Sequence, residues 1–104
     1  MDVERRSVKL LITYDPVPEL REAYFNFVLG EFVPRLEHLG LKMSESWHTA
    51  YGPYPLRLLA FTAPDEAMED ILASDVFSNL EDRLKEYVRN YNRRTVLGRN
   101  RFQF

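Results

Sequence analysis

The residues of this 104-residue chain that could do chemistry are a histidine and an arginine near the middle of the sequence, His48 and Arg57. Histidine changes its charge near neutral pH, so His48 could act as a general base or acid. Arg57 lies in a mostly apolar segment, where a buried guanidinium needs a carboxylate, a carbonyl or an anionic ligand. The most specific catalytic hypothesis is therefore that His48 removes a proton while Arg57 or a tyrosine stabilises the enolate that forms.

Aromatic side chains near the expected strand ends could line a binding pocket. Their rings would contact an apolar or aromatic molecule, and the tyrosine hydroxyls would orient it. These aromatic residues are Tyr14, Trp47, Tyr51 and Tyr54. Structural interpretations stay open beside this one: the rings could form core or dimer packing, and Arg57 could pair with Glu45 or with an acid of a partner subunit.

The segment Glu45-Ser46-Trp47-His48 has the Glu-x-x-His spacing of a metal-ligand pair on a helix. We expect this segment to be a strand, in which residues three apart point to opposite faces, so the two side chains cannot bind one ion. The second histidine, His38, falls at the end of an expected helix, where an imidazole caps carbonyls or faces solvent. The sequence therefore predicts no metal and no other cofactor.

Several classes of protein are excluded by what the sequence lacks. It has no cysteine, which rules out disulfides, thiolate nucleophiles and cysteine-bound metals. It also has no glycine-rich phosphate-binding loop and no G-x-S-x-G elbow, so nucleotide-driven chemistry and hydrolase triads are not expected. The charged N-terminus fits neither a signal peptide nor a membrane span, and we expect a soluble, cytoplasmic protein.

The apolar periodicity predicts six elements, because strands alternate and helices repeat every three to four residues. We expect Pro34 to kink the first helix, Gly40 to end it, and Ser74 to start a new segment within the second. The expected strands cover residues 8–14, 41–51, 56–63 and 95–104, and the expected helices cover residues 18–39 and about 65–91.

This βαββαβ order predicts an α+β fold of the ferredoxin-like type, as one domain over residues 1–104. A four-stranded antiparallel sheet would carry two helices on one face. The helices would cover the alternate positions of the first strand, Val8, Leu10, Ile12 and Tyr14. The open face is expected to carry Leu11, Leu59 and Phe61 among Lys9, Thr13 and Arg57. Such a half-apolar surface favours self-association, so we expect a homodimer.

Charge is distributed unevenly, although the net charge is only −2. Residues 65–86 hold eight acids, whereas the chain beyond Glu86 has five arginines and no acid. Salt bridges to the acidic helix explain such a tail, and phosphate binding is the alternative. An RNA-recognition domain has the same element order, but its third strand presents glycine and alternating aromatic residues. Residues 55–61 offer one aromatic and no glycine, so no nucleic-acid partner is expected.

A family resemblance is carried by the run Phe32-Val33-Pro34-Arg35-Leu36-Glu37-His38-Leu39-Gly40, by Trp47, by Gly52-Pro53 and by the apolar strand that ends at Ala60-Phe61. With these motifs, the chain from about Tyr24 to Leu84 resembles the NIPSNAP-like group of the dimeric α/β-barrel superfamily. The resemblance implies a homodimer whose two sheets form a barrel, with a pocket between sheet and helices in each subunit. The chain departs from the family pattern at Leu59, where the family tends to carry a polar residue.

Relatives in this superfamily include cofactor-free oxygenases, isomerases, haem-degrading enzymes and proteins without an assigned activity, and the fold does not select among them. The leading hypothesis is a homodimeric α/β-barrel protein that binds a small apolar or aromatic molecule. The first alternative is a cofactor-independent oxygenase or isomerase that uses His48 as its base. The second alternative is a structural dimerisation module.

Overall fold

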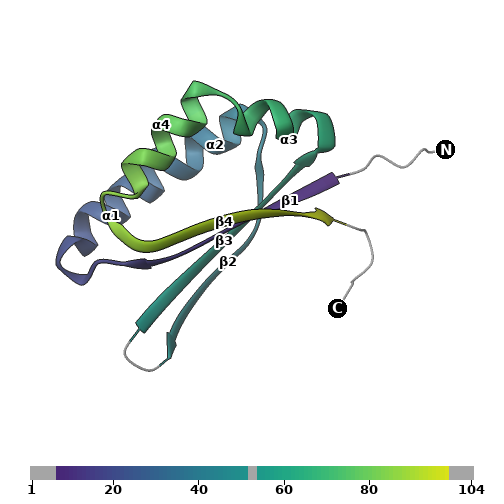
Figure 1. Ribbon diagram of the computed structural model, residues 1–104. Helices are drawn as coiled ribbons and strands as arrows, with labels where there is room; N and C mark the ends of the chain where they lie inside the picture. Colours follow the sequence, from purple (N-terminus) through teal and green to yellow (C-terminus); the bar gives the residue numbers. More distant parts are fainter. Residues whose placement is uncertain (1–6, 52–53, 99–104) are drawn as a thin grey trace.

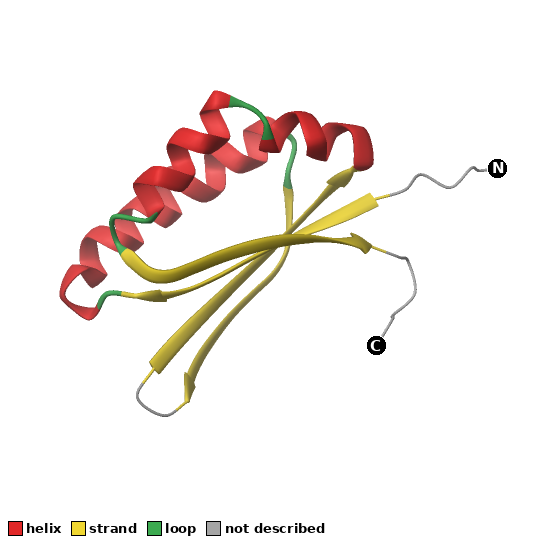
Figure 2. Ribbon diagram, in the orientation of Figure 1, coloured by secondary structure: helices red, strands yellow, loops and turns green. Residues whose placement is uncertain are grey.

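The computed structural model describes residues 7–51 and 54–98, without the side chains of residues 47–51, 54–56 and 98. Within this part of the chain, a four-stranded antiparallel sheet carries the helices on one face (Figures 1 and 2). The strand order is β2-β3-β1-β4, so β1 and β3 are central. The elements are β1 (Ser7–Pro16), η1 (Pro18–Leu20), α1 (Arg21–Phe27), η2 (Val28–Phe32), α2 (Val33–Leu39), β2 (Lys42–Tyr51), β3 (Tyr54–Pro64), α3 (Asp65–Leu72), α4 (Asp75–Leu84) and β4 (Val88–Gly98). The predicted ferredoxin-like α+β fold is confirmed.

The first helical segment changes its winding just before Pro34. A five-residue π-helical turn, η2, separates α1 from α2, and Pro34 lies in the first turn of α2. Proline has no N–H to donate and its ring pushes against the carbonyl four residues earlier, so a wider turn accommodates it. Gly40 ends α2 with a φ of 115°, a left-handed conformation that glycine adopts without a Cβ clash. The expected single helix over residues 18–39 is therefore a series of short segments.

Ser74 starts a new helix, as predicted. Its hydroxyl accepts a hydrogen bond from the N–H of Phe77 at 3.2 Å and donates one to the carbonyl of Ile71 at 2.7 Å. The helix α4 ends at Leu84, however, and the prediction that it reaches Tyr91 is wrong. Residues from Val88 onward belong to β4 and pair with β1, so the last strand also begins seven residues earlier than the expected position 95. Pairing along the whole of β1 overrides a helix-like apolar spacing near residue 88.

The helix-facing side of β1 is the predicted one, because Leu10, Ile12 and Tyr14 are fully buried. The face assigned to β3 is wrong, since the register pairs these three residues with Phe61, Leu59 and Arg57 respectively. Paired residues share a face, so Arg57, Leu59 and Phe61 point toward the helices. The open face carries Lys9, Leu11, Thr13, Leu58, Ala60 and Thr62 instead. The sequence could not decide between the two sets because β3 is apolar on both faces.

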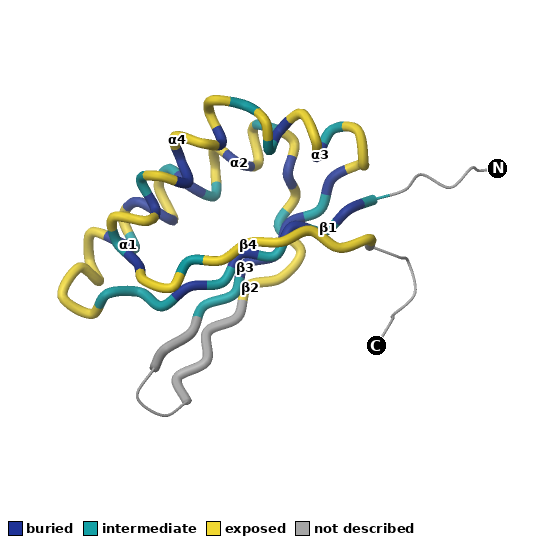
Figure 3. Tube along the Cα trace, in the orientation of Figure 1, coloured by how far each residue is buried: buried dark blue, intermediate teal, exposed yellow. Residues whose placement is uncertain are grey.

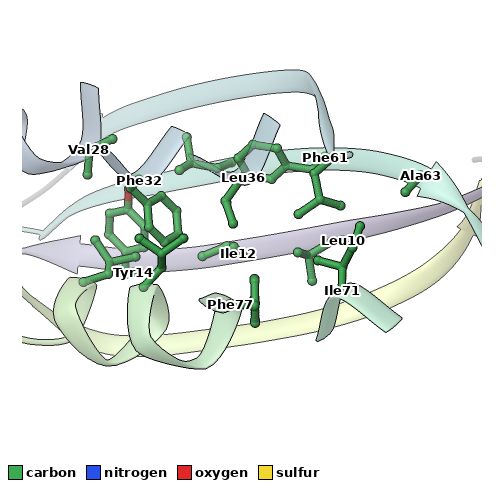
Figure 4. Close-up of a cluster of buried hydrophobic side chains, with 14 of the residues drawn as sticks. Leu10, Ile12, Tyr14, Val28, Phe32, Leu36, Phe61, Ala63, Ile71 and Phe77 are labelled. Carbon is green, nitrogen blue, oxygen red and sulfur yellow. The ribbon is translucent and has the colours of Figure 1, made fainter. Parts of the chain in front are cut away.

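A hydrophobic core fills the space between the sheet and the helices. Figure 3 shows that buried residues occur in both the helices and the strands. Phe32 and Leu36 from the first helical segment and Phe77 from α4 pack over β1, as Figure 4 shows. Each of these three side chains is fully buried, which stabilises the fold by about 1.5–3 kcal/mol for each one. These side chains therefore fill the space between the middle of the sheet and the helices. No helix in the described part of the chain is long and apolar enough to cross a membrane.

Candidate functional site

A pocket of about 280 Å³ lies where the chain leaves β1 and enters α1. The N–H of Val17 donates to the carbonyl of Tyr87 at 3.0 Å, which ties this connection to the start of β4. The pocket is lined by Pro16, Val17, Pro18, Arg21, Tyr24, Phe25 and Arg57. Two prolines fix the backbone of one wall, because a proline ring restricts φ. The lining residues come from the end of β1, from η1 and α1, and from β3, and one wall of the pocket is stiff.

Arg57 reaches the pocket from the central strand β3. Its guanidinium carbon lies 5.5 Å from the centre of the Phe25 ring, and that of Arg21 lies 5.8 Å from the same ring. The Nε of Arg57 is buried and has no hydrogen-bond partner among the described residues. Buried donors are almost always hydrogen-bonded, so this N–H is an unusual feature of the pocket.

The expected ion pair between Arg57 and Glu45 is not formed. A bulge in β2 between Met43 and Glu45 shifts the register, so that Glu45 lies opposite Ala60 on the open face. Its carboxylate is 3.8 Å from the ammonium of Lys9. The sequence pattern, which assumes regular alternation from Leu41 to Tyr51, misses this bulge because one extra residue reverses every following side chain.

A pair of buried, hydrogen-bonded tyrosines includes one residue that lines the pocket, Tyr24. The hydroxyl oxygens of Tyr14 and Tyr24 are 2.7 Å apart, and their rings meet edge to face at 5.8 Å. Burial raises the pKa of both phenols above the usual value, and the positive charge of Arg57 acts in the opposite direction on both. Both tyrosines are therefore neutral hydrogen-bonding groups at physiological pH, and the charge of Arg57 reaches their hydroxyls.

The electrostatic character of the pocket is positive. Both of its charged lining residues, Arg21 and Arg57, are arginines, and no carboxylate is among the described lining residues. Arginine stays protonated at any physiological pH. The remaining lining is aromatic or aliphatic, so the pocket can hold a flat apolar group and attract a negative charge beside it.

The structure places the predicted site residues in two groups. Tyr14 is fully buried and reaches the pocket only through Tyr24, whereas Arg57 lines it directly. Trp47, His48, Tyr51 and Tyr54 lie on the β2–β3 hairpin, and their side chains fall outside the described residues. The backbone register pairs His48 with Arg57, which is itself the partner of Tyr14. The roles of the hairpin residues in binding or catalysis stay predictions.

Of the seven lining residues, only Arg57 is among the site residues that the sequence predicts. The six that it missed are Pro16, Val17, Pro18, Arg21, Tyr24 and Phe25. Tyr24 and Phe25 fall within the helix expected over residues 18–39, where aromatic residues at helical spacing are typical of core packing. The signal that could have found Arg21 and Phe25 is their spacing, because residues four apart on a helix are neighbours. In the structure the guanidinium carbon of Arg21 lies 5.8 Å from the centre of the Phe25 ring, although Arg21 itself is exposed.

Other charged groups have structural partners. The buried carboxylate of Glu81 accepts hydrogen bonds from Nε of Arg93 at 2.5 Å and from the hydroxyl of Tyr91 at 2.7 Å. The predicted salt bridge between the basic tail and the acidic helix is therefore present at this position. His38 lies exposed in the last turn of α2. In the described ranges, no cluster of three or more metal-ligating side chains exists.

The fold is shared with several solved structures. A NIPSNAP family protein from Agrobacterium tumefaciens superposes with a TM-score of 0.69 at 13% identity, over 98% of this chain and 94% of that protein. An uncharacterised NIPSNAP domain protein from Burkholderia xenovorans gives 0.65 at 11% identity, over 93% and 99% of the two chains. A candidate antibiotic biosynthesis monooxygenase from Nitrosomonas europaea gives 0.65 at 9% identity, over 98% and 97%.

No protein-family model matches the chain, and no curated protein sequence matches it. The likeness to the solved structures is confined to the fold, because all three sequence identities are very low. At that level it confirms the resemblance that the motifs around Pro34, Trp47 and Gly52 predict: the chain has the fold of NIPSNAP proteins. Fold alone does not assign an activity, so the function must be argued from the pocket.

Proposed function

We propose that this protein binds a small aromatic or apolar molecule in the pocket between β1, α1 and β3. The observation that carries the proposal is the unpartnered Nε of Arg57, buried beside the ring of Phe25. A cavity of about 150 Å³ admits benzene. This pocket, with a volume of about 280 Å³, accommodates one substituted ring or two fused rings.

The same proposal includes a homodimer that joins the open faces of two sheets. Leu11 and Leu58 form a partly exposed apolar strip on that face, across the central strands. A second copy of the sheet would cover this strip, as the family resemblance implies, and closed two-fold association is the commonest symmetric solution. The helices would then lie outside the barrel. Each subunit would be a single domain with its own pocket.

A nuclear magnetic resonance titration tests the binding proposal. Amide spectra of the full chain, recorded with and without 2-naphthol, should show shifts at Val17, at residues 21–25 and at Arg57, whereas Pro16 and Pro18 have no amide N–H to observe. The variant Val17→Trp fills the pocket and should abolish those shifts. Val76→Trp is its matched control, because Val76 is an exposed valine of α4 outside the pocket lining. Shifts confined to other residues, or shifts that survive Val17→Trp, would refute the proposal.

A second candidate function is a cofactor-independent oxygenase or isomerase. The observation that favours it is the register, which places Tyr14, Arg57 and His48 at paired positions of three neighbouring strands. An enzyme of this type needs a base near a group that stabilises the developing enolate, and His48 and Arg57 would supply them. The titration of the His48 ring should then shift when 2-naphthol or a keto acid is added, with no shift at His38. Equal, ligand-independent titration of both rings would exclude this candidate.

A further inference from the structure

We propose that the ligand carries an oxyanion beside its aromatic group, held by the Nε–H of Arg57 and by the hydroxyl of Tyr24, with Tyr14 positioning that hydroxyl. The proposal rests on the proposed function and names the chemical class of its ligand. A carboxylate, an enolate or a phenolate conjugated to a ring has the required chemistry.

The Nε–H of Arg57 is a donor with no acceptor in the part of the chain that the structure describes. Its Nε is buried and unbonded among the described residues, and the carboxylate expected as its partner, Glu45, lies on the other face of the sheet beside Lys9. Because a guanidinium cannot lose its proton in a protein, the site keeps both a positive charge and a directed N–H. An oxyanion is the acceptor that satisfies both, through a charge-assisted hydrogen bond.

The pair of Tyr14 and Tyr24 has two hydroxyl protons, and only one of them is used in the hydrogen bond between the two residues. Two hydroxyls share one hydrogen bond, so the one that accepts still carries a proton to donate. Neither hydroxyl bonds any other described group, and only Tyr24 lines the pocket. If Tyr24 donated to Tyr14, the proton of Tyr14 would be left in the core. The favourable arrangement has Tyr14 donating to Tyr24, and Tyr24 donating into the pocket.

The charge of the pocket agrees with this arrangement. Burial raises the pKa of Tyr24, so its hydroxyl keeps the proton that the ligand needs. Arg21 adds a second positive charge to the lining, and Phe25 lies within 6 Å of both guanidinium carbons. A ring stacked near Phe25 with its oxyanion toward Arg57 and Tyr24 would contact every one of these groups.

Calorimetric titration of the full chain with 2-naphthoate and with 2-naphthamide tests the inference, since the two probes have the same shape and differ in charge. The acid should bind at least about tenfold more tightly than the amide. Arg57→Leu should lower the affinity for 2-naphthoate by about 10- to 100-fold, and Tyr24→Phe should lower it by about tenfold. The affinity for 2-naphthamide should change less than about twofold in both variants. Arg57→Lys, which keeps the charge and lacks the Nε–H, should also lower the affinity for 2-naphthoate.

Arg35→Gln is the charge-matched control, because Arg35 is exposed on α2 and lies outside the pocket lining, and it should leave the affinity for 2-naphthoate unchanged. Equal affinity for the acid and the amide would overturn the oxyanion inference while the proposed function stands. Binding of neither probe would refute the proposed function itself. An acid preference that survives both Arg57→Leu and Arg57→Lys would place the anion elsewhere and would also overturn the inference. Amide spectra of each variant establish that it is folded.

Discussion

Replacing Arg57 by leucine should leave the protein as stable as before or make it more stable. The buried Nε–H has no partner among the described residues, and an unsatisfied buried donor costs about 1–3 kcal/mol. The substitution removes this cost and loses one contact between the guanidinium and the Phe25 ring, worth about 0.5–1 kcal/mol. Leucine retains much of the apolar packing of the arginine stem. The expected change in the free energy of unfolding lies between zero and a gain of about 2 kcal/mol.

Thermal melts followed by circular dichroism measure this change, because about 1 kcal/mol shifts the melting temperature of a chain this size by roughly 4–8 °C. Arg93→Leu is the matched control. Its Nε bonds the carboxylate of Glu81, which is only 9% exposed, so its removal should cost about 1–3 kcal/mol. A loss of roughly 3–5 kcal/mol in Arg57→Leu would refute the reasoning, because it would reveal a buried acid as the partner of Arg57.

Three further predictions concern the tyrosines and the open face. Tyr14→Phe and Tyr24→Phe should each cost about 1–3 kcal/mol in chemical denaturation, and the double variant should cost less than their sum, because it leaves no buried hydroxyl unpaired. Burial raises the pKa of Tyr14, Tyr24 and Tyr91, so the free energy of unfolding should hold below about pH 10 and fall above it as the unfolded phenols ionise. Phenolate absorbance should show these three ionising only on unfolding, and earlier ionisation would contradict their burial. Light scattering at micromolar concentration should give about twice the 12.3 kDa chain mass, and a monomer would remove the barrel proposal.

The parts of the fold that the sequence predicts are those with a local physical cause. The alternation of Leu10, Ile12 and Tyr14 is a property of one strand, and it correctly identifies the side that the helices cover. Ser74 caps a helix through its own hydroxyl, and Gly40 ends one because it tolerates a positive φ. Each of these features is decided within a few residues of the chain.

The features of the fold that the sequence does not predict depend on pairing between distant segments. Leu59 and Arg57 face the helices because of the register with β1, and nothing in the doubly apolar strand itself reveals it. The bulge before Glu45 separates that carboxylate from Arg57, and the extension of β4 back to Val88 is imposed by its pairing with β1. The composition of the pocket cannot be predicted from the sequence for the same reason, since Arg21 and Phe25 come close to Arg57 only once the sheet has formed.

The Nε–H signal of Arg57 in a nuclear magnetic resonance spectrum reports most directly on the central claim, that the pocket binds an aromatic ligand at this arginine. The signal is assigned by its loss in Arg57→Leu. On addition of 2-naphthoate it should move to higher proton frequency, as the free donor gains an acceptor, whereas the Nε–H of Arg93, already bonded to Glu81, should stay in place. An Arg57 signal that does not move at saturating 2-naphthoate, while signals elsewhere do, would contradict the account.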